Sequence, residues 1–355
     1  MSVVERPRMS VIVPAYRCTP YLRVTLEALE RSTLARDVWE LIVVDDSSDD
    51  DTADVARTKA DLVLTTDDGP RGPACARNIG ARQAHGAVIV FVDADVVVMP
   101  DTLALIDERM QDHNIGAVFG SYDAFPSAPG LVSQYRNLLH HYVHHQHPGD
   151  ASTFWAGCGA VRRAAFLEVG GFDEHRYPRP QIEDIELGYR LRAHGVVIVL
   201  DPRIQGKHLK RWTLSGMIRT DLRERAIPWM HLLIERNETI TPGPLNLHWR
   251  QKLLTVSSCL TLLLLAVAAM TLDSRWLLPV SVLAGVIVLG DLALFAWFSR
   301  ARGPLFASAA VPLRWAFYVV SGVGAAWAIV THRWHPRHPP PAPLREVARA
   351  QAPEI

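Results

Sequence analysis

The sequence has few cysteines, and their spacing supports no covalent or metal framework. Its four cysteines, Cys18, Cys75, Cys158 and Cys259, are scattered over 355 residues and form no CxxC pair. We therefore expect neither a disulfide framework nor a zinc ribbon, and a reducing, cytosolic setting fits the first part of the chain. The opening residues MSVVERPRMS also lack an apolar signal segment, so no secretory leader is expected.

The chain has no net charge, because Lys+Arg and Asp+Glu both number 37. The charges are unevenly placed, however. Residues 251–355 hold nine basic and four acidic residues, which leaves 28 basic and 33 acidic residues in residues 1–250. An acidic first part followed by a basic, apolar part indicates a membrane surface as a partner and argues against nucleic acid.

Charge is almost missing from three apolar runs near the C-terminal end. Leu253–Leu272 and Trp315–Thr331 contain none, and Trp276–Ser299 contains only Asp291. Each run is long enough to cross about 30 Å of hydrocarbon as a helix. We therefore expect two to three transmembrane helices. The third run either spans the membrane, re-enters it or lies on its surface. Asp291 is either a functional carboxylate or one paired with a neighbouring helix near the interface.

The loop SRARGPL between the second and third runs is basic, which places it in the cytosol. The first run then leaves the cytosol, the second returns, and the N-terminal domain is cytosolic. If the third run spans, the Pro-rich tail ends outside. We expect four units: a catalytic domain at 1–212, an amphipathic interfacial helical segment at 213–250, a membrane domain at 251–333 and a flexible tail at 334–355. The segment MIRTDLRERAIPW in the second unit has the two-sided pattern of interfacial helices.

The first 210 residues alternate between strand and helix patterns. Apolar runs typical of strands alternate with helices whose apolar residues recur every three to four positions. This alternation predicts an α/β domain with a mostly parallel sheet, flanked by helices, and with ligands bound beyond the carboxyl ends of the strands. The expected strands are residues 10–16, 39–45, 61–66 and 87–95, and the expected helices are residues 21–33, 50–60, 74–86 and 100–112.

Polar residues follow three of these strands: Pro14–Tyr16, Asp45–Asp46 and Asp93–Asp95. An isolated buried carboxylate is costly, so we expect the aspartates to face the crevice at the sheet edge. Carboxylate oxygens suit Mg²⁺ or Mn²⁺, which commonly take substrate phosphates as further ligands.

The pattern VIVPAYR…LIVVDDSSDDDT…GPACARNIGARQAHGAVIVFVDADVVVMPDTL resembles family 2 glycosyltransferases of the GT-A fold over about 100 residues. The resemblance implies an inverting transfer of a sugar from a nucleotide diphosphate, with uridine or guanosine as the nucleoside and Mn²⁺ or Mg²⁺ as cofactor. Asp93 would touch the ribose and Asp95, beyond Ala94, the metal. The resemblance also assigns Pro14, Ala15 and Tyr16 to the base pocket, one of Asp45 and Asp46 to the base, and Arg71, Arg77 and Asn78 to nucleotide and phosphate contacts.

The segment TFWAGCGAVRRAAFLEVGGFDE resembles the acceptor side of the same family, with Trp155, Gly157 and Cys158 as acceptor contacts. Glu183 and Asp184 then open a predicted helix. Inverting transfer to a hydroxyl needs a base, which a carboxylate can be, although a carboxylate at a helix start can also cap it. The resemblance implies that Asp184 is the base and that Glu183 supports it or contacts the acceptor.

The segment LDPRIQGKHLKRWTL resembles the family's last site segment. By that resemblance His208 joins Asp95 at the metal, and imidazole is a plausible ligand beside oxygen donors. Trp212 resembles an acceptor contact of processive synthases, but Gln205 lies six residues before Arg211, so the Q-x-x-R-W spacing is absent. The cations either neutralise the departing diphosphate or face the membrane. These cations are Lys207, Lys210 and Arg211.

Residues 137–147 carry five histidines, of which His140–His144 and His141–His145 have the i, i+4 spacing that can bind zinc on a helix. HExxH is absent, and no carboxylate lies in the run, so hydrogen-bonding imidazoles near the acceptor or the membrane are the favoured interpretation.

Together these features predict a membrane-anchored inverting glycosyltransferase at a bacterial-type plasma membrane, with a cytosolic catalytic domain and a lipid-linked or cell-envelope glycan acceptor. One alternative is transfer to a polyprenyl phosphate, whose phosphate oxygen needs no base. Another is an inactive scaffold on the same fold. A phosphohydrolase or nucleotidyltransferase is disfavoured because no P-loop is present.

Overall fold

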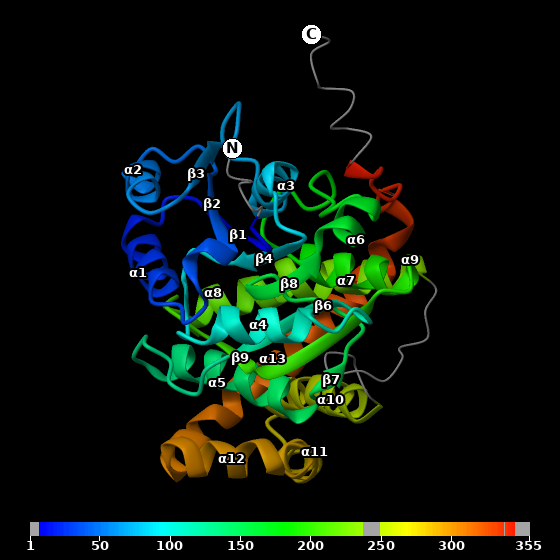
Figure 1. Ribbon diagram of the computed structural model, residues 1–355. Coiled ribbons are helices and arrows are strands. Elements are labelled where there is room, and N and C mark those ends of the chain that lie inside the picture. The colour runs from blue at the N-terminus through cyan, green and yellow to red at the C-terminus, as the bar shows by residue number, and fades with distance from the viewer. Residues whose placement is uncertain (1–6, 237–248, 337, 345–355) are drawn as a thin grey trace, which may run out of the picture.

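The computed structural model describes residues 7–236, 249–336 and 338–344. In this part of the chain, an α/β body built on one sheet is followed by helices near the C-terminal end (Figure 1). The strand order is β3-β2-β1-β4-β8-β6-β9-β5, with the short β7 (Gly149–Asp150) paired to β9.

The first half of the sheet is parallel. β1 (Met9–Ala15) lies between β2 (Trp39–Asp45) and β4 (Val88–Val92), and β3 (Leu62–Thr65) extends β2. β1 and β4 read as nearly continuous apolar runs because both faces of the sheet are covered. The predicted parallel sheet is therefore confirmed for this half.

The second half is mixed. β8 (Cys158–Arg162) runs antiparallel to both β4 and β6 (Ile115–Tyr122). β9 (Val197–His208) runs parallel to β6 and antiparallel to β5 (Val96–Val98). The register of β5 and β9 sets Val96 opposite His208, so the residues just before Val96 end up beside the end of β9.

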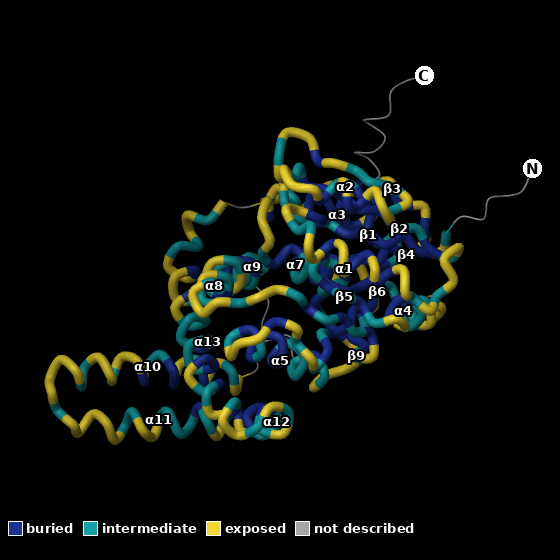
Figure 2. The backbone as a smooth tube through the Cα atoms, turned by 90° about the vertical axis from the view of Figure 1, so that its left-hand side faces the viewer, coloured by how far each residue is buried: buried dark blue, intermediate teal, exposed yellow. Residues whose placement is uncertain are grey.

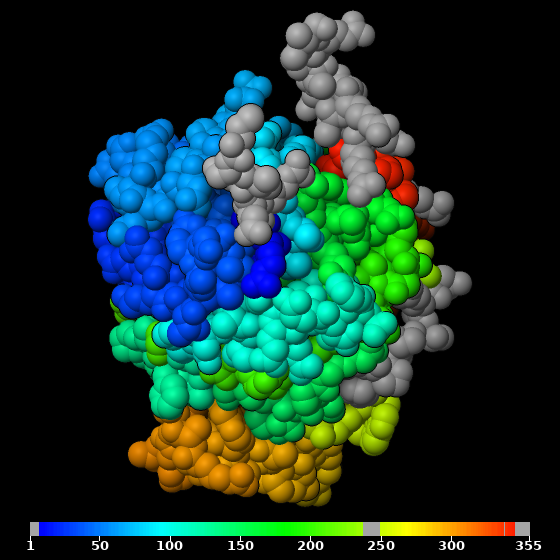
Figure 3. Space-filling model, viewed as in Figure 1, coloured from blue at the N-terminus to red at the C-terminus, as the bar shows by residue number. Residues whose placement is uncertain are grey.

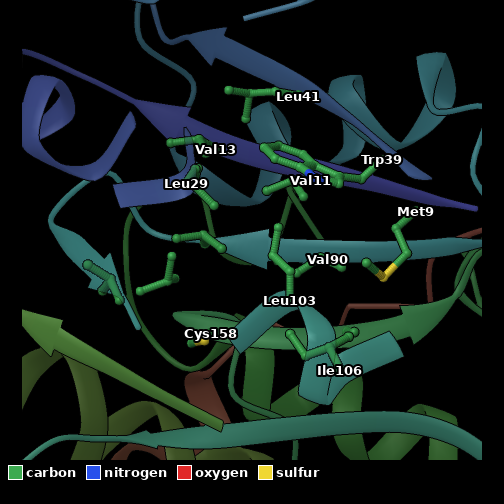
Figure 4. Packing of buried hydrophobic residues seen from close by; sticks show 14 of the residues in the cluster. Met9, Val11, Val13, Leu29, Trp39, Leu41, Val90, Leu103, Ile106 and Cys158 are labelled. Carbon is green, nitrogen blue, oxygen red and sulfur yellow. The ribbon is translucent and has the colours of Figure 1, made fainter. Parts of the chain in front are cut away.

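Helices cover both faces of the sheet, and two buried apolar clusters fill the spaces between. Because successive strand residues point to opposite faces, Val11 and Val13 enter one cluster and Ile12 enters the other. Figure 4 shows Val11, Val13 and Val90 packed together in the first cluster. The helices of the body are α1 (Thr19–Glu30), α2 (Thr52–Arg57), α3 (Pro73–Gln83), α4 (Thr102–Met110), α5 (Leu131–Gln146), α6 (Arg163–Glu168) and α7 (Glu183–Ala193).

The expected interfacial segment is helical over residues 214–236. It consists of α8 (Leu214–Arg219), a π-helical stretch Thr220–Ala226 and α9 (Ile227–Arg236). Its Asp221 is buried and lies 2.6 Å from an Nη atom of Arg136 on α5. One charged residue of this segment is therefore used to attach it to the body.

The C-terminal helices are α10 (Trp249–Thr271), α11 (Leu277–Gly290), α12 (Leu292–Arg302) and α13 (Pro304–Thr331). In the described residues, two helices are long and apolar enough to cross a membrane: Trp249–Thr271 and Pro304–Trp334. The second predicted run is instead broken at Asp291, where Ser274–Gly290 and Leu292–Arg302 meet at a bend of 66°. α10 and α11 project from the body side by side (Figure 2).

Asp291 is paired, as the helix-pairing interpretation expected. Its carboxylate accepts hydrogen bonds from Arg314 Nε at 2.6 Å and from the Tyr318 hydroxyl at 2.8 Å, both on α13. Arg250 at the start of α10 lies 3.5 Å away.

The Pro-rich segment differs from the expected flexible tail over residues 338–344. Leu344 is buried in the apolar cluster of the α/β body with Phe166 and Phe172. Since this segment packs on the body, a boundary at residue 334 does not separate it from the body.

Candidate active site

Asp95 and His208 are neighbours at the edge of the sheet, as the sequence predicted. His208 Nε2 lies 3.4 Å from Asp95 Oδ2, and His208 Nδ1 lies 2.9 Å from the buried Asn137 Oδ1. Asn137 Oδ1 therefore holds one ring nitrogen of His208, and the other ring nitrogen faces Asp95. The Tyr122 ring stacks on the imidazole at 4.6 Å between centroids, so the ring of His208 is fixed on two sides.

These two side chains fit a hard divalent cation. Burial raises the pKa of Asp95, but the hydrogen bond and charge of His208 and the charge of Lys210 outweigh it and hold that pKa below its ordinary value. No group of three or more His, Cys, Asp or Glu residues suited to a metal occurs among the described residues. Asp95 and His208 would therefore supply two ligands, and a diphosphate would supply others, as is common for Mg²⁺.

Arg77 joins the two ends of the candidate site. Its Nη2 donates to Asp93 Oδ1 at 2.6 Å, and its Nη1 donates to Glu183 Oε1 at 3.1 Å. The guanidinium is buried, and these carboxylates compensate its charge. Asp93 keeps 31% of its side chain exposed, so it stays open to a ligand from the crevice.

Asp184 is the freer member of the acidic pair. Glu183 is buried and also accepts from the backbone N–H of Gln181 at 2.8 Å. Asp184 accepts from the N–H of Ile185 at 2.8 Å and from that of Ala156 at 3.3 Å. Burial and the charge of Glu183 raise the pKa of Asp184 to about 7, which suits a general base at neutral pH.

The structure distinguishes between Asp45 and Asp46. Asp46 accepts from the Thr66 hydroxyl at 2.8 Å and from the backbone N–H groups of Arg71 and Gly72 at 2.8 and 2.7 Å. Its carboxylate therefore shapes the loop before α3. Asp45 accepts only from the N–H of Ser48, at 3.3 Å, among the described residues. Asp45 is consequently the better candidate for a base contact.

The other residues predicted to line the nucleotide crevice divide into two groups. Tyr16 is exposed just beyond β1, which ends in Pro14 and Ala15, and Arg71 is exposed and lies 3.3 Å from Glu174. Asn78 is a correction: its amide donates to the Phe172 carbonyl and to Glu174, and accepts from the Phe172 N–H. It is buried and holds α3 to the GGFDE turn instead of facing the crevice.

Sequence comparison shows what this domain is similar to. Residues 10–170 match the family described as "Glycosyl transferase family 2". Validoxylamine A glucosyltransferase of Streptomyces hygroscopicus subsp. jinggangensis is 32% identical over 54% of this chain and 52% of its own length. UDP-Glc:α-D-GlcNAc-diphosphoundecaprenol β-1,3-glucosyltransferase of Escherichia coli is 30% identical over 32% of this chain and 46% of its own length.

The chain spans about half the length of the first curated relatives that it matches. Among solved structures, the mannosyltransferase PcManGT of Pyrobaculum calidifontis, in complex with GDP-Man and Mn²⁺, is similar at a TM-score of 0.56 and 21% identity. The likeness covers 93% of this chain and 88% of that one. It confirms the predicted GT-A fold of the glycosyltransferase domain.

The predicted acceptor side of the glycosyltransferase domain is an aromatic cluster. The Trp155 ring is half-buried and lies 4.9 Å from Tyr122 and 4.7 Å from His140. A side chain at Gly157 would meet that ring at 2.5 Å, so Gly157 makes room for Trp155. Cys158 is a correction, because it is wholly buried in the core, where burial raises the pKa of its thiol to about 12. It cannot contact an acceptor.

Of the three cations predicted to neutralise the diphosphate or face the membrane, Lys207 differs from expectation. Lys207 lies on the opposite side of β9 from His208 and is held 2.9 Å from the buried Asp123. It is a correction, since Lys210 is the cation whose charge acts on Asp95. Arg211 is exposed and forms no hydrogen bond or ion pair with a described residue. The Trp212 ring lies 4.4 Å below the Lys210 ammonium group.

The histidines of α5 use their rings within the protein. His144 Nδ1 lies 2.9 Å from the Gly120 carbonyl oxygen, and His141 Nδ1 lies 2.8 Å from that of Tyr122. Burial lowers the pKa of His144 to about 4 and that of His140 well below its ordinary value. They are neutral at pH 7 and fit the hydrogen-bonding interpretation.

Sequence reasoning missed Asn137, Tyr122 and Arg225. Arg225 lies one turn after Asp221 on the π-helical stretch, a type of distortion often found at functional sites. The nearby charge of Arg136 and desolvation of the guanidinium lower the pKa of Arg225, while the carboxylates of Asp221 and, to a smaller extent, Asp184 oppose that effect. Arg225 is exposed and has no hydrogen-bond or ion-pair partner among the described residues. Arg225 is therefore an unpaired cation that feels the charge of Asp184. It lies in the segment 213–250, which the sequence predicted to be an interfacial helix with its charged side at the membrane surface.

Proposed function

We propose that the protein is a membrane-anchored, inverting, metal-dependent glycosyltransferase that moves a sugar from a nucleotide diphosphate to a hydroxyl of a lipid-linked or cell-envelope glycan acceptor. The observation that carries the proposal is the Arg77 bridge. It fixes Asp93, at the donor end of the crevice, relative to Glu183 and the adjacent Asp184 at the acceptor end. A direct displacement requires the donor sugar and the acceptor hydroxyl to be held in a fixed relative orientation, and this bridge would fix the residues that bind them.

On the donor side, Tyr16 and Asp45 would bind the base, and Asp93 the ribose. Asp95 and His208 would hold Mn²⁺ or Mg²⁺, which when bound would neutralise charge on the diphosphate. Lys210 adds a further positive charge next to Asp95. The similar mannosyltransferase, solved with GDP-Man and Mn²⁺, supports this arrangement.

On the acceptor side, Asp184 would take the proton of the hydroxyl whose oxygen attacks the anomeric carbon. A new carbon–oxygen bond forms while the bond between that carbon and the β-phosphate oxygen breaks, and the nucleoside diphosphate leaves with the electron pair. The pKa of Asp184 near 7 supports proton removal at neutral pH. A polyprenyl phosphate acceptor would need no base, so the state of Asp184 favours a hydroxyl.

The apolar helices and Arg225 favour a lipid-linked acceptor. An unpaired guanidinium near the base can pair with a phosphate of the acceptor. The name of the Escherichia coli relative gives a diphosphoundecaprenol-linked sugar as its acceptor, which agrees with this acceptor class. The catalytic domain would then work on the cytosolic face of a bacterial-type plasma membrane.

The test uses the full chain purified in detergent. Nucleoside diphosphate release and sugar transfer are measured with UDP-sugars and GDP-sugars as donors. Each donor is tested in the presence of Mn²⁺, Mg²⁺ or a chelator. The acceptors are sugar-diphosphate lipids and polyprenyl phosphate. We expect metal-dependent transfer to the hydroxyl acceptor. Activity that survives both chelation and Asp95→Ala would contradict the metal assignment, and absence of binding to any nucleotide diphosphate would favour an inactive scaffold.

A further inference from the structure

α13 is apolar enough to span a membrane, but both of its ends pack on the α/β body. Near its start, Ala310 and Leu313 pack in one apolar cluster with Tyr135 of α5. Just past its end, His332 Nδ1 lies 3.2 Å from His231 Nδ1 of α9, and the His335 ring stacks on the His231 ring at 3.9 Å. A helix that crosses a bilayer would carry its two ends to opposite sides.

The chain beyond α13 also stays with the body. A side chain at Gly170 would meet the Ala342 carbonyl oxygen at 2.6 Å, and one at Gly171 would meet Leu344 Cδ1 at 2.6 Å. In Figure 3 the red C-terminal segment lies directly on the green surface of the body. The segment that follows α13 is therefore on the same side as the glycosyltransferase domain.

Within the described residues the hairpin of α10 and α11, unlike α13 and the segment after it, does not pack on the α/β body along its length. It projects from the body (Figure 2), and its apolar side chains are exposed along its length. The 20 apolar residues Leu253–Leu272 extend roughly 30 Å as a helix, which equals the thickness of the hydrocarbon layer. Lys252 lies before this run, and Asp273 and Arg275 lie at the tip after it, so charged groups mark both ends.

The depth of α13 follows from where it crosses α10. A side chain at Gly322 of α13 would meet Cys259 Sγ at 2.5 Å and Thr255 Cγ2 at 3.1 Å. Thr255 and Cys259 follow Lys252 by three and seven residues, or about 5 to 10 Å along a helix. That distance equals the depth at which an amphipathic helix lies in the membrane interface. The paired Asp291 lies toward the polar start of α10, because it contacts Arg250.

The outer face of α13, together with the 3₁₀ turn His332–Trp334 that follows it, carries an apolar stripe with helical spacing. Val323, Trp327, Val330 and Trp334 follow at i, i+4, i+7 and i+11, and their exposed fractions are 50, 60, 65 and 63%. The neighbouring Gly324 faces inward, since a side chain there would meet Ala226 Cβ of the π-helical stretch at 2.6 Å. One side of the helix therefore contacts the body and the other side has no cover in the described residues.

We propose that α10 and α11 form the membrane-spanning hairpin and that α13 lies in the plane of the membrane surface, with its stripe seated among the lipid acyl chains. The segment 338–344 then stays on the side of the catalytic domain. The stripe begins at Val323, next to Gly322, which contacts α10 of the exposed apolar hairpin, and this is why lipid, and not a protein partner, is its occupant. The inference rests on the membrane anchoring in the proposed function, but not on sugar transfer.

The first experiment measures depth in reconstituted full-length protein whose four native cysteines are replaced by alanine. Single cysteines for a spin label are introduced by Val323→Cys, Trp327→Cys, Val330→Cys and Trp334→Cys, and collision with oxygen and with a water-soluble nickel complex reports each depth. We expect one shallow depth for the four sites. A spanning helix would separate the first and last sites by roughly 16 Å, and that gradient would overturn the inference.

The second experiment labels sealed vesicles with a membrane-impermeant maleimide. Gln83→Cys on the exposed end of α3 marks the catalytic side, Ser274→Cys marks the hairpin tip, and Pro343→Cys reports the exposed segment after α13. We expect Pro343→Cys to label with Gln83→Cys and opposite to Ser274→Cys. Labelling of Pro343→Cys with Ser274→Cys would refute the topology. Labelling of all three from one side, with no lipid contact in the stripe, would refute membrane anchoring itself, and the detergent assay of sugar transfer would be unaffected.

Discussion

Asp93 and Glu183 are tied to each other through one buried guanidinium. Arg77 lies 2.6 Å from an oxygen of Asp93, at the end of β4, and 3.1 Å from an oxygen of Glu183, at the start of α7. The end of β4 and the start of α7, which carry the proposed donor and acceptor residues, therefore share one buried cation as support.

Replacing Arg77 should damage both folding and activity. Arg77→Met leaves two carboxylates without their partner, and breaking a buried pair costs about 3–5 kcal/mol of unfolding free energy. Arg77→Lys should rescue little, because a single ammonium group cannot reproduce the forked contact to both. Denaturant unfolding and sugar transfer check this. Arg71→Met is the matched control: its exposed pair with Glu174 should contribute less than about 1 kcal/mol. Equal losses in the two methionine variants would contradict the prediction.

Asp184→Asn should lower the rate of transfer by about 10²–10⁴-fold while nucleotide-sugar binding is retained. The wild-type rate should rise with pH through about 7, because Asp184 must be ionised to accept the proton. Single-turnover transfer between pH 5.5 and 8.5, alongside donor binding by calorimetry, measures both. An unchanged rate in Asp184→Asn would exclude Asp184 as the base.

The same raised pKa predicts an effect on stability. In the unfolded chain Asp184 ionises near pH 4, and in the fold it ionises near pH 7, so the unfolded state binds fewer protons between these values. Stability should therefore fall as the pH rises from 4 to 7. Asp184→Asn should raise the melting temperature at pH 8 and lose that advantage toward pH 4. A lower melting temperature for the variant at pH 8 would contradict the assignment.

Asn137 should be needed for metal binding although it does not touch the metal. Asn137→Leu removes the acceptor that orients His208, and losses of this kind cost about 10–100-fold in metal affinity. Asn137→Asp keeps an acceptor oxygen and should restore most of the affinity. Mn²⁺ titration by calorimetry with a bound nucleoside diphosphate measures this, with exposed His85→Gln as control. Wild-type affinity in Asn137→Leu would count against His208 as a ligand.

Arg225→Gln should weaken acceptor binding selectively. If the unpaired guanidinium meets an acceptor phosphate, its loss should raise the acceptor KM at least about tenfold, as expected for a charge-assisted hydrogen bond worth 1.5–3 kcal/mol. The donor KM should not change. Arg223→Gln, an exposed arginine of the same helix, is the control. A rise in the donor KM alone would move Arg225 to the departing diphosphate.

The local sequence pattern was sufficient to predict the parallel strands and the aspartates that follow them, because an apolar run and the carboxylates after it are consecutive residues. Prediction failed for side chains whose role depends on a partner far away in the sequence. Asn78 depends on Phe172, and Lys207 on Asp123. Cys158 sits on a strand buried on both faces. Hydropathy likewise could not place α13, because a helix packed along the body and a helix in a bilayer need the same apolar residues.

The position of α13 would also set the reach of the proposed enzyme. Its Gly322 lies against α10 of the hairpin, and its Gly324 lies against the stretch that bears Arg225. With the hairpin in the bilayer, the candidate site would be held at a fixed height above the lipid headgroups. The fold would work as a ruler, selecting acceptors by their distance from the membrane as well as by their chemistry.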